Sequence, residues 1–428
     1  MKKIIIALSF LVFNNLFSQK DETIKWINEN SIKIEDANPD TELLIFGTNT
    51  PSKFANAQIF GFGEASHNTK EFFDIKAKFF KHLVKTQDVK IFIMEDAYQT
   101  ESGINEWISG GEGDIKTIGR NFRIGFWNRK EVINLLQWMR DYNMDKSKKE
   151  QIRFYGMDVK YGDKLNIEIR NYIKEHEIVI DESLLKVIDS CANKKVEYYV
   201  PSDWASVQIP KLKKVEQILE DFNKGNFEIK RDQYNSIRRS LSYLIKYTQL
   251  VENPGNDVRD LKMFENVKWI IDHETDNGKV FIWAHNEHIN KKEMYYTGSG
   301  KITLGAHLKK YYNDDYYSVG FDFGIGEIRG YVAKKGKPNY WKTYEIEKPF
   351  RKTYAHTLVE ANDAIYFIDM ENALNSDSTN FFAIKKKHLL VGGGGYQPKP
   401  LHRILVSKIY TETYDGLIFV RNISPVTW

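Results

Sequence analysis

The 428-residue chain lacks three features that would each indicate a class of protein. It has one cysteine, Cys191, which excludes an internal disulfide and every metal site built from several cysteines. Its 62 lysine and arginine residues nearly balance its 58 aspartate and glutamate residues, and a net charge of +4 argues against an extended nucleic-acid-binding face. No apolar run is long enough for a transmembrane helix. With 42% hydrophobic and 28% charged residues, the composition is that of a globular protein with one large or two smaller domains.

The first eighteen residues have the pattern of a targeting segment. Lys2 and Lys3 precede the apolar run Ile4–Phe13, and Ser18 offers a small residue at a plausible cleavage site. This pattern is typical of a cleaved secretory signal peptide, and a buried first strand is the alternative interpretation. We therefore expect a signal peptide at residues 1–18 and a periplasmic or secreted mature protein without a membrane anchor.

Short apolar runs rich in β-formers alternate with longer segments of helical period. Strands are expected at Ile59–Phe62, Ile91–Met94, Ile152–Tyr155, Val280–Trp283, Tyr317–Phe321, Ala364–Ile368 and Leu417–Val420, and helices at Asn68–Lys85, Lys130–Tyr142 and Val258–His273. Asn68 with Glu71 three residues later approximates a capping box at the start of the first of these helices. The alternation predicts an α/β fold, with a mostly parallel sheet flanked by helices.

Residues 164–253 differ from the rest of the chain. They carry long helical patterns, at Ile209–Phe222 and Tyr234–Leu250, and few strand runs. We interpret this segment as a helical insertion that caps the active-site cleft. Residues 19–163 and 254–428 then form the α/β catalytic core.

Ionisable residues follow four of the predicted strands directly. In an open α/β sheet, the carboxyl ends of parallel strands line the ligand crevice. The residues expected there are Glu64, His67, Glu95, Asp158, His285 and His288. Taken one at a time, each has a structural explanation, and for Asp158 hydrogen bonding to loop amides is the preferred one. Taken as a set, they favour a catalytic site of carboxylates and imidazoles, because burying so many polar groups in one crevice costs free energy.

The spacing of these residues suggests roles for them. His67 lies just before a predicted helix start, where the helix dipole disfavours imidazolium and favours a neutral base. Glu64, three residues earlier, can orient the ring as a carboxylate orients a triad histidine. Arg259, on the helix before the fourth strand, can join His285 in stabilising a developing oxyanion.

Several familiar catalytic motifs are missing. The sequence has no G-x-S-x-G nucleophile elbow. The pairs Glu64-x-x-His67 and His285-x-x-His288 are not the H-E-x-x-H zinc helix, so no metal or other cofactor is expected.

Two runs of one residue type stand apart from these candidate residues. The glycine run Gly392–Gly395 predicts a flexible turn. The basic run Lys385–Lys387 is interpreted as a solvated face and not as a nucleic-acid site.

Ordered blocks along the chain resemble the erythromycin esterase family. The blocks are Gly63-Glu64-Ala65-Ser66-His67 with Lys70-Glu71-Phe72-Phe73, then Glu95, Trp127-Asn128-Arg129-Lys130-Glu131, Trp138-Met139-Arg140 with Asn143, Gly156-Met157-Asp158, Arg259-Asp260 with Asn266, and Trp283-Ala284-His285-Asn286-Glu287-His288. The similarity runs from about Ile59 to Pro425. Position 70 is Lys where the family commonly has Arg, and the helical segment has no recognisable match.

The resemblance implies an α/β core with a helical part and a cleft that holds a macrolide. It implies hydrolysis of the macrolide lactone by a water molecule, with His67 as general base and no required metal. The implied catalytic residues are His67, Glu64, Glu95, Arg259 and His285, and the implied substrate-binding residues are His288, Trp127 and Lys70. The expected partner is a small-molecule macrolide, with no nucleic acid, and a monomer is expected.

Two alternatives to macrolide hydrolysis stay open. One is an esterase or lactonase of the same fold that acts on a non-macrolide substrate. The other is a non-catalytic protein that uses the histidines and glutamates to bind a metal or a haem-like ligand.

Overall fold

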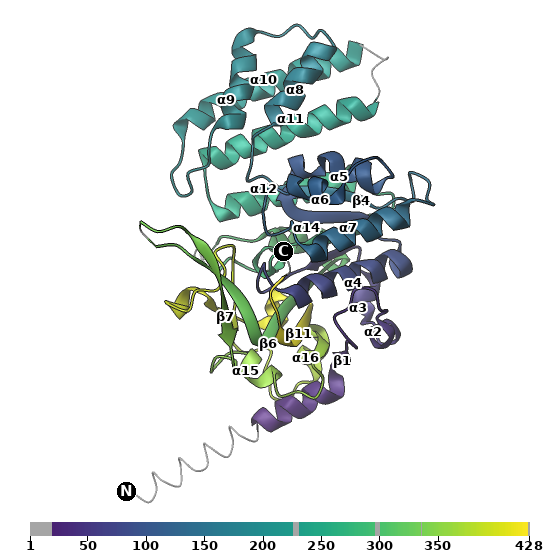
Figure 1. Ribbon diagram of the computed structural model, residues 1–428, viewed down its shortest axis with the longest axis vertical. Coiled ribbons are helices and arrows are strands. Elements are labelled where there is room, and N and C mark those ends of the chain that lie inside the picture. The colour runs from purple at the N-terminus through teal and green to yellow at the C-terminus, as the bar shows by residue number, and fades with distance from the viewer. Residues whose placement is uncertain (1–18, 226–230, 296–299, 335, 427–428) are drawn as a thin grey trace, which may run out of the picture. The chain divides into compact units, whose positions relative to one another are not determined.

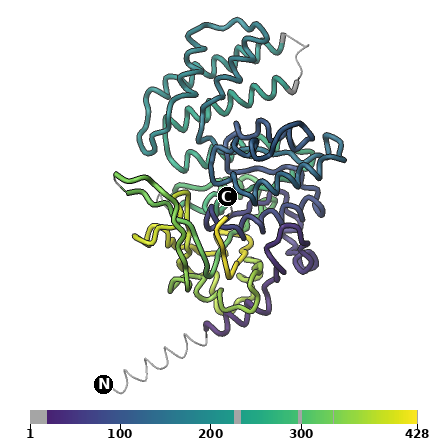
Figure 2. The backbone as a smooth tube through the Cα atoms, in the orientation of Figure 1, coloured from purple at the N-terminus to yellow at the C-terminus, as the bar shows by residue number. Residues whose placement is uncertain are grey.

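The computed structural model describes residues 19–225, 231–295, 300–334 and 336–426. The predicted signal peptide, residues 1–18, lies outside the described residues. The chain forms two compact units, whose paths can be followed in Figures 1 and 2. The first contains the described residues up to Lys90, Asn128–Trp138 and those from Asp276, and the second contains Ile91–Trp127 and Met139–Thr275. The predicted division into a core and a helical insertion stays a prediction.

The first unit is built on a mostly parallel sheet. Its strands are, in spatial order, β1 (Ile32–Lys33), β8 (Ile365–Asp369), β11 (Gly416–Ile423), β6 (Tyr316–Val332), β2 (Ile59–Phe62) and β5 (Val280–Trp283). The pairs β11/β6, β6/β2 and β2/β5 are parallel, whereas β8 is antiparallel to both β1 and β11. The predicted α/β fold with a mostly parallel sheet flanked by helices is confirmed.

Two antiparallel hairpins extend this unit. Strand β7 (Tyr340–Ile346) pairs with the C-terminal part of β6, from Gly326 to Val332, and the long ribbon is visible in Figure 1. Strands β9 (Lys386–Leu389) and β10 (Leu405–Lys408) form a separate two-stranded sheet.

Helix α4 (Lys70–Gln87) covers the first unit's sheet with an apolar face that includes Phe72 and Phe79. The predicted capping box is wrong. The helix begins at Lys70 after Thr69, and no side chain caps it. Glu71 instead accepts hydrogen bonds from the backbone N–H of Ser424 at 2.7 Å and from its hydroxyl at 2.6 Å, because the C-terminal segment passes beside this helix start.

The first unit also has a helical stretch at residues 19–30. Its short helices include α2 (Leu44–Thr48), α3 (Ser52–Asn56), α13 (Asn286–Ile289), α14 (Leu304–Tyr312), α15 (Ala355–Leu358), α16 (Met370–Ser376) and α17 (Tyr410–Thr413). Helix α7 (Lys130–Asn143) has residues in both units.

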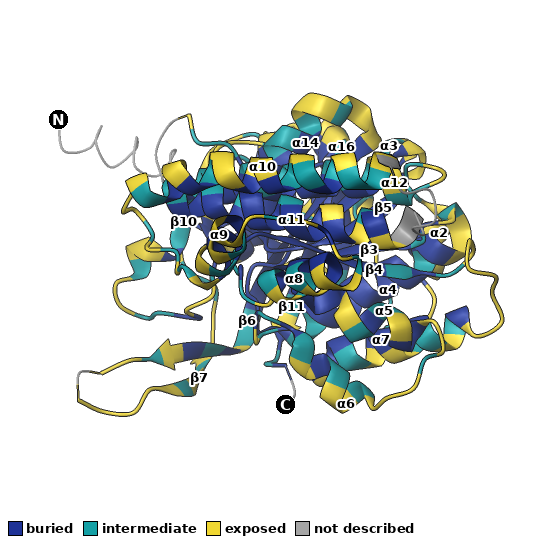
Figure 3. Ribbon diagram, turned by 90° about the horizontal axis from the view of Figure 1, so that it is seen from above, coloured by how far each residue is buried: buried dark blue, intermediate teal, exposed yellow. Residues whose placement is uncertain are grey.

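The second unit combines two parallel strands with a group of helices, of which α8–α12 are the longer ones. The strands are β3 (Ile91–Ala97) and β4 (Arg153–Asp158), and the helices are α5 (Glu101–Ile108), α6 (Ile115–Ile118), α8 (Leu165–Glu175), α9 (Glu182–Asn193), α10 (Asp203–Gly225), α11 (Arg231–Glu252) and α12 (Asn256–Glu274). Helices α8–α11 pack around one apolar core that includes Ile169, Leu212 and Leu244. Figure 3 shows the buried stripe of α11, and the helices predicted at 209–222 and 234–250 are confirmed.

Candidate functional site

A hydrogen-bonded Glu–His pair lies at the carboxyl end of β2. The Glu64 side chain is fully buried, and the Nδ1 of His67 lies 2.6 Å from its Oε1. His67 is 6% exposed. An ionised carboxylate only accepts hydrogen bonds, so the shared proton lies on Nδ1 and the basic nitrogen of the ring is Nε2. The predicted orientation of His67 by Glu64 is therefore present in the geometry.

A buried lysine completes this pair. The ammonium of Lys76, on α4, donates to Glu64 Oε2, and its side chain is 0% exposed. Its Nζ also lies 4.0 Å from the ring centroid of Trp283. The two oxygens of Glu64 are thus held by different partners, which fixes the carboxylate in the rotamer that faces His67.

Sequence reasoning did not single out Lys76, although a signal existed. The residue lies four positions after Phe72 and four before Phe80, on the apolar face of its helix. A lysine on that face needs a buried partner, since an isolated buried ammonium is very costly.

His285 lies beside His67 in the same unit. The ring centroids of the two histidines are 4.7 Å apart, with an interplanar angle of 38°. His285 is the N-cap of α13, where its Nδ1 accepts from the backbone N–H of Glu287 at 3.4 Å. A ring nitrogen that accepts carries no proton, so a neutral His285 carries its proton on Nε2 and acts there as a donor.

A close backbone approach brings α13 to the end of β2. The N–H of Asn286 donates to the carbonyl of Glu64 at 2.9 Å. The Asn286 side chain also bonds both backbone groups of Phe321 on β6, at 2.7 and 3.0 Å. A Cβ on Gly63 would lie 2.2 Å from Asn286 Oδ1 and 3.0 Å from its Cα, so only glycine permits this approach.

His288, predicted to bind substrate, lies buried on α13 beside a second ion pair. The carboxylate of Glu287 accepts from Lys408 Nζ at 3.1 Å and from the backbone N–H of Tyr295 at 2.7 Å. Burial raises the pKa of Glu287 even though Lys408 opposes that shift. Sequence reasoning missed Lys408, because its partner lies 121 positions away along the chain.

A second cluster of predicted residues forms within the second unit. Arg259 on α12 donates to Asp158 through Nε at 2.9 Å and Nη2 at 2.7 Å, and to Glu95 through Nη2 at 2.9 Å. Burial lowers the pKa of the Arg259 guanidinium, but the ion pairs with Asp158 and Glu95 outweigh burial and raise it well above its ordinary value. The preferred interpretation of Asp158, bonding to loop amides, is wrong, because its carboxylate forms a two-pronged pair with Arg259.

Trp127 and Lys70, the two remaining residues predicted to contact the substrate, each bind another residue of the protein. Trp127 is buried, and its indole N–H donates to the carbonyl of Glu95 at 2.8 Å. Lys70 forms an ion pair with Asp74 one turn along α4. Burial raises the pKa of Asp74 to about 6, although Lys70 opposes that shift. The roles of Trp127 and Lys70 in substrate binding stay predictions.

The structure thus brings the predicted residues together in two groups. Glu64, His67 and His285 form one in the first unit, and Glu95, Asp158 and Arg259 form one in the second. Among the described residues, no group of three or more His, Cys, Asp or Glu side chains is arranged to hold a metal ion. No helix in the described ranges is both long and apolar enough to cross a membrane.

Comparison with known proteins places the chain in a family. The sequence model of the family described as erythromycin esterase matches residues 84–423. The chain is 24% identical to the erythromycin esterase type II of Escherichia coli over 306 residues, which are 65% of this chain and 71% of that protein.

Two solved structures share the fold. A Bacillus cereus protein superposes with a TM-score of 0.81 at 21% identity, covering 95% of this chain and 98% of the other. A mutant of the erythromycin esterase EreC in its open conformation superposes with a TM-score of 0.67 at 14% identity, covering 92% and 98% of the two chains. The family match spans most of the chain, and the chain therefore belongs to the erythromycin esterase family of hydrolases.

Proposed function

We propose that this hydrolase opens the macrolactone ester of erythromycin-type macrolides with a water molecule activated by His67. The observation that carries the proposal is the Glu64–His67 pair, in which the carboxylate binds Nδ1 and directs the basic Nε2 away from itself. Family membership supports an ester as the bond that is cleaved.

The reaction balances without a covalent enzyme intermediate. Nε2 of His67 takes a proton from water while the water oxygen bonds to the ester carbonyl carbon, which gives a tetrahedral oxyanion and an imidazolium. The carbon–oxygen bond to the alcohol then breaks, and the imidazolium returns its proton to the departing alkoxide. The products are a carboxylic acid and an alcohol on an opened ring.

Other residues supply charge and orientation in this proposal. Glu64 stabilises the imidazolium, and Lys76 holds Glu64 in place. His285 donates from Nε2 to the oxyanion, an effect that reduces the barrier by about 3 kcal/mol per donor in comparable sites. We further propose that Arg259 holds Glu95 in place. The water-positioning role predicted for Glu95 and the oxyanion role predicted for Arg259 stay predictions, because Nε and Nη2 of Arg259 already bind carboxylates.

The proposal includes export and a monomeric state. The basic start and apolar run of residues 1–18 support cleavage and a periplasmic or secreted enzyme. Sequencing of the mature N-terminus from the natural host and light scattering of the purified protein test these two points.

The test compares two histidine substitutions in the purified protein. His67→Asn removes the proposed base, and His356→Asn makes the same change at an exposed histidine. Incubation with erythromycin should yield a product heavier by one water for the wild type and His356→Asn, and none for His67→Asn with an unchanged circular dichroism spectrum. Ring opening by His67→Asn would contradict the proposed base, and its absence in the wild type would favour a non-macrolide ester.

A further inference from the structure

The geometry points to an anion-binding subsite beside the Glu64–His67 pair, and we propose that it holds a carboxylate, phosphate or sulfate group on the substrate. The inference rests on the proposed ester hydrolysis. Erythromycin itself bears no such group, so the inference predicts that an ester with a negatively charged oxyacid group is a better substrate than a neutral ester of the same kind.

The subsite is a cavity of about 1160 Å³ in the first unit. It is lined by the segments 292–295, 392–395, 402–409 and 412–413, with Lys385 and Gln397. Two contacts join its surroundings to the segments that carry His67 and His285. The N–H of Val391, just before the glycine run, donates to the carbonyl of Ala65 at 2.7 Å, and Lys408 of the lining binds Glu287 at 3.1 Å.

The charged lining of the cavity is predominantly positive. It contains four lysine or arginine side chains and two glutamates. Lys292 forms an ion pair with Glu412 at 3.4 Å, and Lys408 forms an ion pair with Glu287, which is not part of the lining. Among the described residues, neither Lys385 nor Arg403 forms an ion pair. These two cations are therefore available to a ligand.

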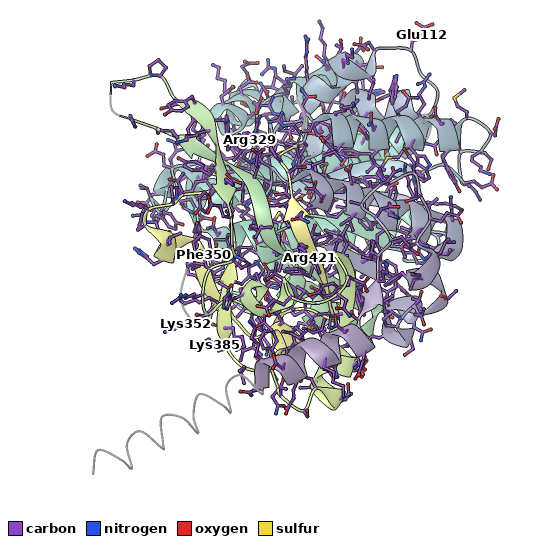
Figure 4. All side chains as sticks on the ribbon, turned by 60° about the horizontal axis from the view of Figure 1, so that its bottom comes forward. Glu112, Arg329, Phe350, Lys352, Lys385 and Arg421 are labelled. Carbon is purple, nitrogen blue, oxygen red and sulfur yellow. The ribbon has the colours of Figure 1, made fainter. Side chains whose placement is uncertain are left out.

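Lys385 stands on an exposed flank of the first unit. Figure 4 labels it close to Lys352, and a backbone hydrogen bond of 3.2 Å from Lys387 to the carbonyl of Lys352 joins the two segments. The solvated face predicted for Lys385–Lys387 thus borders a cavity at one of its residues.

The glycine run supplies backbone N–H groups as a second kind of hydrogen-bond donor to an anion. Within the described parts of the chain, the N–H groups of Gly392, Gly393 and Gly394 donate to no other residue, whereas Gly395 N–H closes a turn onto Gly392 O at 2.8 Å. A Cβ on Gly392 or Gly394 would meet no atom within 4 Å, so the backbone there is open to a ligand. Successive backbone N–H groups near a turn are a recurrent way of binding oxyanions.

The glycine run also allows a test in which a negative charge is introduced and a neutral substitution serves as the matched control. Gly394→Asp places a carboxylate in the cavity without a clash, and Gly394→Asn adds nearly the same volume without the charge. Arg403→Gln removes one unpaired cation of the lining. Lys348→Gln removes an exposed lysine outside it, and controls for a general effect of net charge.

The first measurement is calorimetric titration of each protein with sodium sulfate and with sodium succinate at constant ionic strength. We expect binding by the wild type, Gly394→Asn and Lys348→Gln, and at least about fivefold weaker binding by Gly394→Asp and Arg403→Gln, because a charge-assisted contact is lost or repelled. Equal binding by Gly394→Asp and Gly394→Asn, or no binding by the wild type, would overturn the subsite.

The second measurement compares kcat/KM for two activated esters, p-nitrophenyl hemisuccinate and the neutral p-nitrophenyl butyrate. The wild type should prefer the anionic ester, and the preference should fall at least about fivefold in Arg403→Gln and not in Lys348→Gln. An undiminished preference in Arg403→Gln overturns the inference while leaving ester hydrolysis intact. Conversely, anion binding that depends on residue 394 in a protein that opens no macrolide and cleaves neither activated ester would refute the proposed function and keep the subsite.

Discussion

Breaking the buried Lys76–Glu64 pair should destabilise the protein far more than replacing the whole pair. Lys76→Met keeps most of the side-chain volume but leaves Glu64 without its ammonium, and Glu64→Gln leaves the ammonium without its carboxylate. Both side chains are 0% exposed, so neither remaining charge can recover its solvation from water. We expect each single substitution to cost about 3–5 kcal/mol in the free energy of unfolding.

The double substitution should recover much of that loss. Glu64→Gln with Lys76→Met leaves two neutral groups, and neutral replacements of buried pairs are often close to the wild type in stability. If each single change costs about 4 kcal/mol, independent effects would sum to about 8 kcal/mol, whereas we expect a double-variant cost below about 3 kcal/mol. For a chain of this length, about 4 kcal/mol corresponds to a shift of about 4–5 °C in the midpoint of a single cooperative transition.

The assay is a double-mutant cycle followed by calorimetry and by urea unfolding. Two compact units can unfold separately, so the comparison is made on the transition that shifts in the single variants. Activity supplies an independent readout. Glu64→Gln should lower kcat by at least about a hundredfold, because the carboxylate that stabilises imidazolium is gone, and Lys76→Met should lower it less.

Two results would refute this reasoning. Additive losses in the cycle would mean that the two side chains do not depend on each other for burial. A larger loss of kcat in Lys76→Met than in Glu64→Gln would mean that Lys76 does more than hold the carboxylate.

Three further predictions concern other buried groups. Arg239→Met should cost about 3–5 kcal/mol by thermal unfolding, because Glu101, whose carboxylate it binds at 2.6 Å through two nitrogens, is left buried and unpaired; an unchanged midpoint would contradict this. Burial raises the pKa of Asp322 to about 7, so its stabilising contribution is present below about pH 4 and is lost as the pH rises toward 7. The midpoint of thermal unfolding of Asp322→Asn should therefore rise relative to that of the wild type as the pH increases from about 5 to 8, and a difference that does not change with pH would refute the raised pKa of Asp322. Gly63→Ala should cost about 1–3 kcal/mol and most of the activity, because its Cβ displaces Asn286; a wild-type rate would show that the approach relaxes freely.

Much of the α/β framework is readable from local patterns along the chain. The strands Ile59–Phe62 and Val280–Trp283 match their predicted bounds, since continuous apolar runs are the signature of strands buried on both faces. Helix α4 was predicted from its apolar period, although its start was not. The positions of Glu64 and His67 after a strand likewise placed them at a sheet edge, and their spacing of three residues allowed the contact that the structure shows.

Partners distant along the chain could not be found in this way. Lys76 is recognisable as an unusual lysine on an apolar face, but that its charge goes to Glu64 depends on how α4 packs against the end of β2. The preference for loop amides at Asp158 failed for the same reason, since its partner Arg259 lies 101 positions away.

The order of residues thus settles the hydrophobic period and which ionisable groups follow a strand, because both depend on neighbours a few positions apart. Which charges neutralise one another, and where a cavity opens beside the glycine run, depend on packing between distant segments. Burial makes an unpaired charge too costly to tolerate, and only the folded chain determines which groups are buried together.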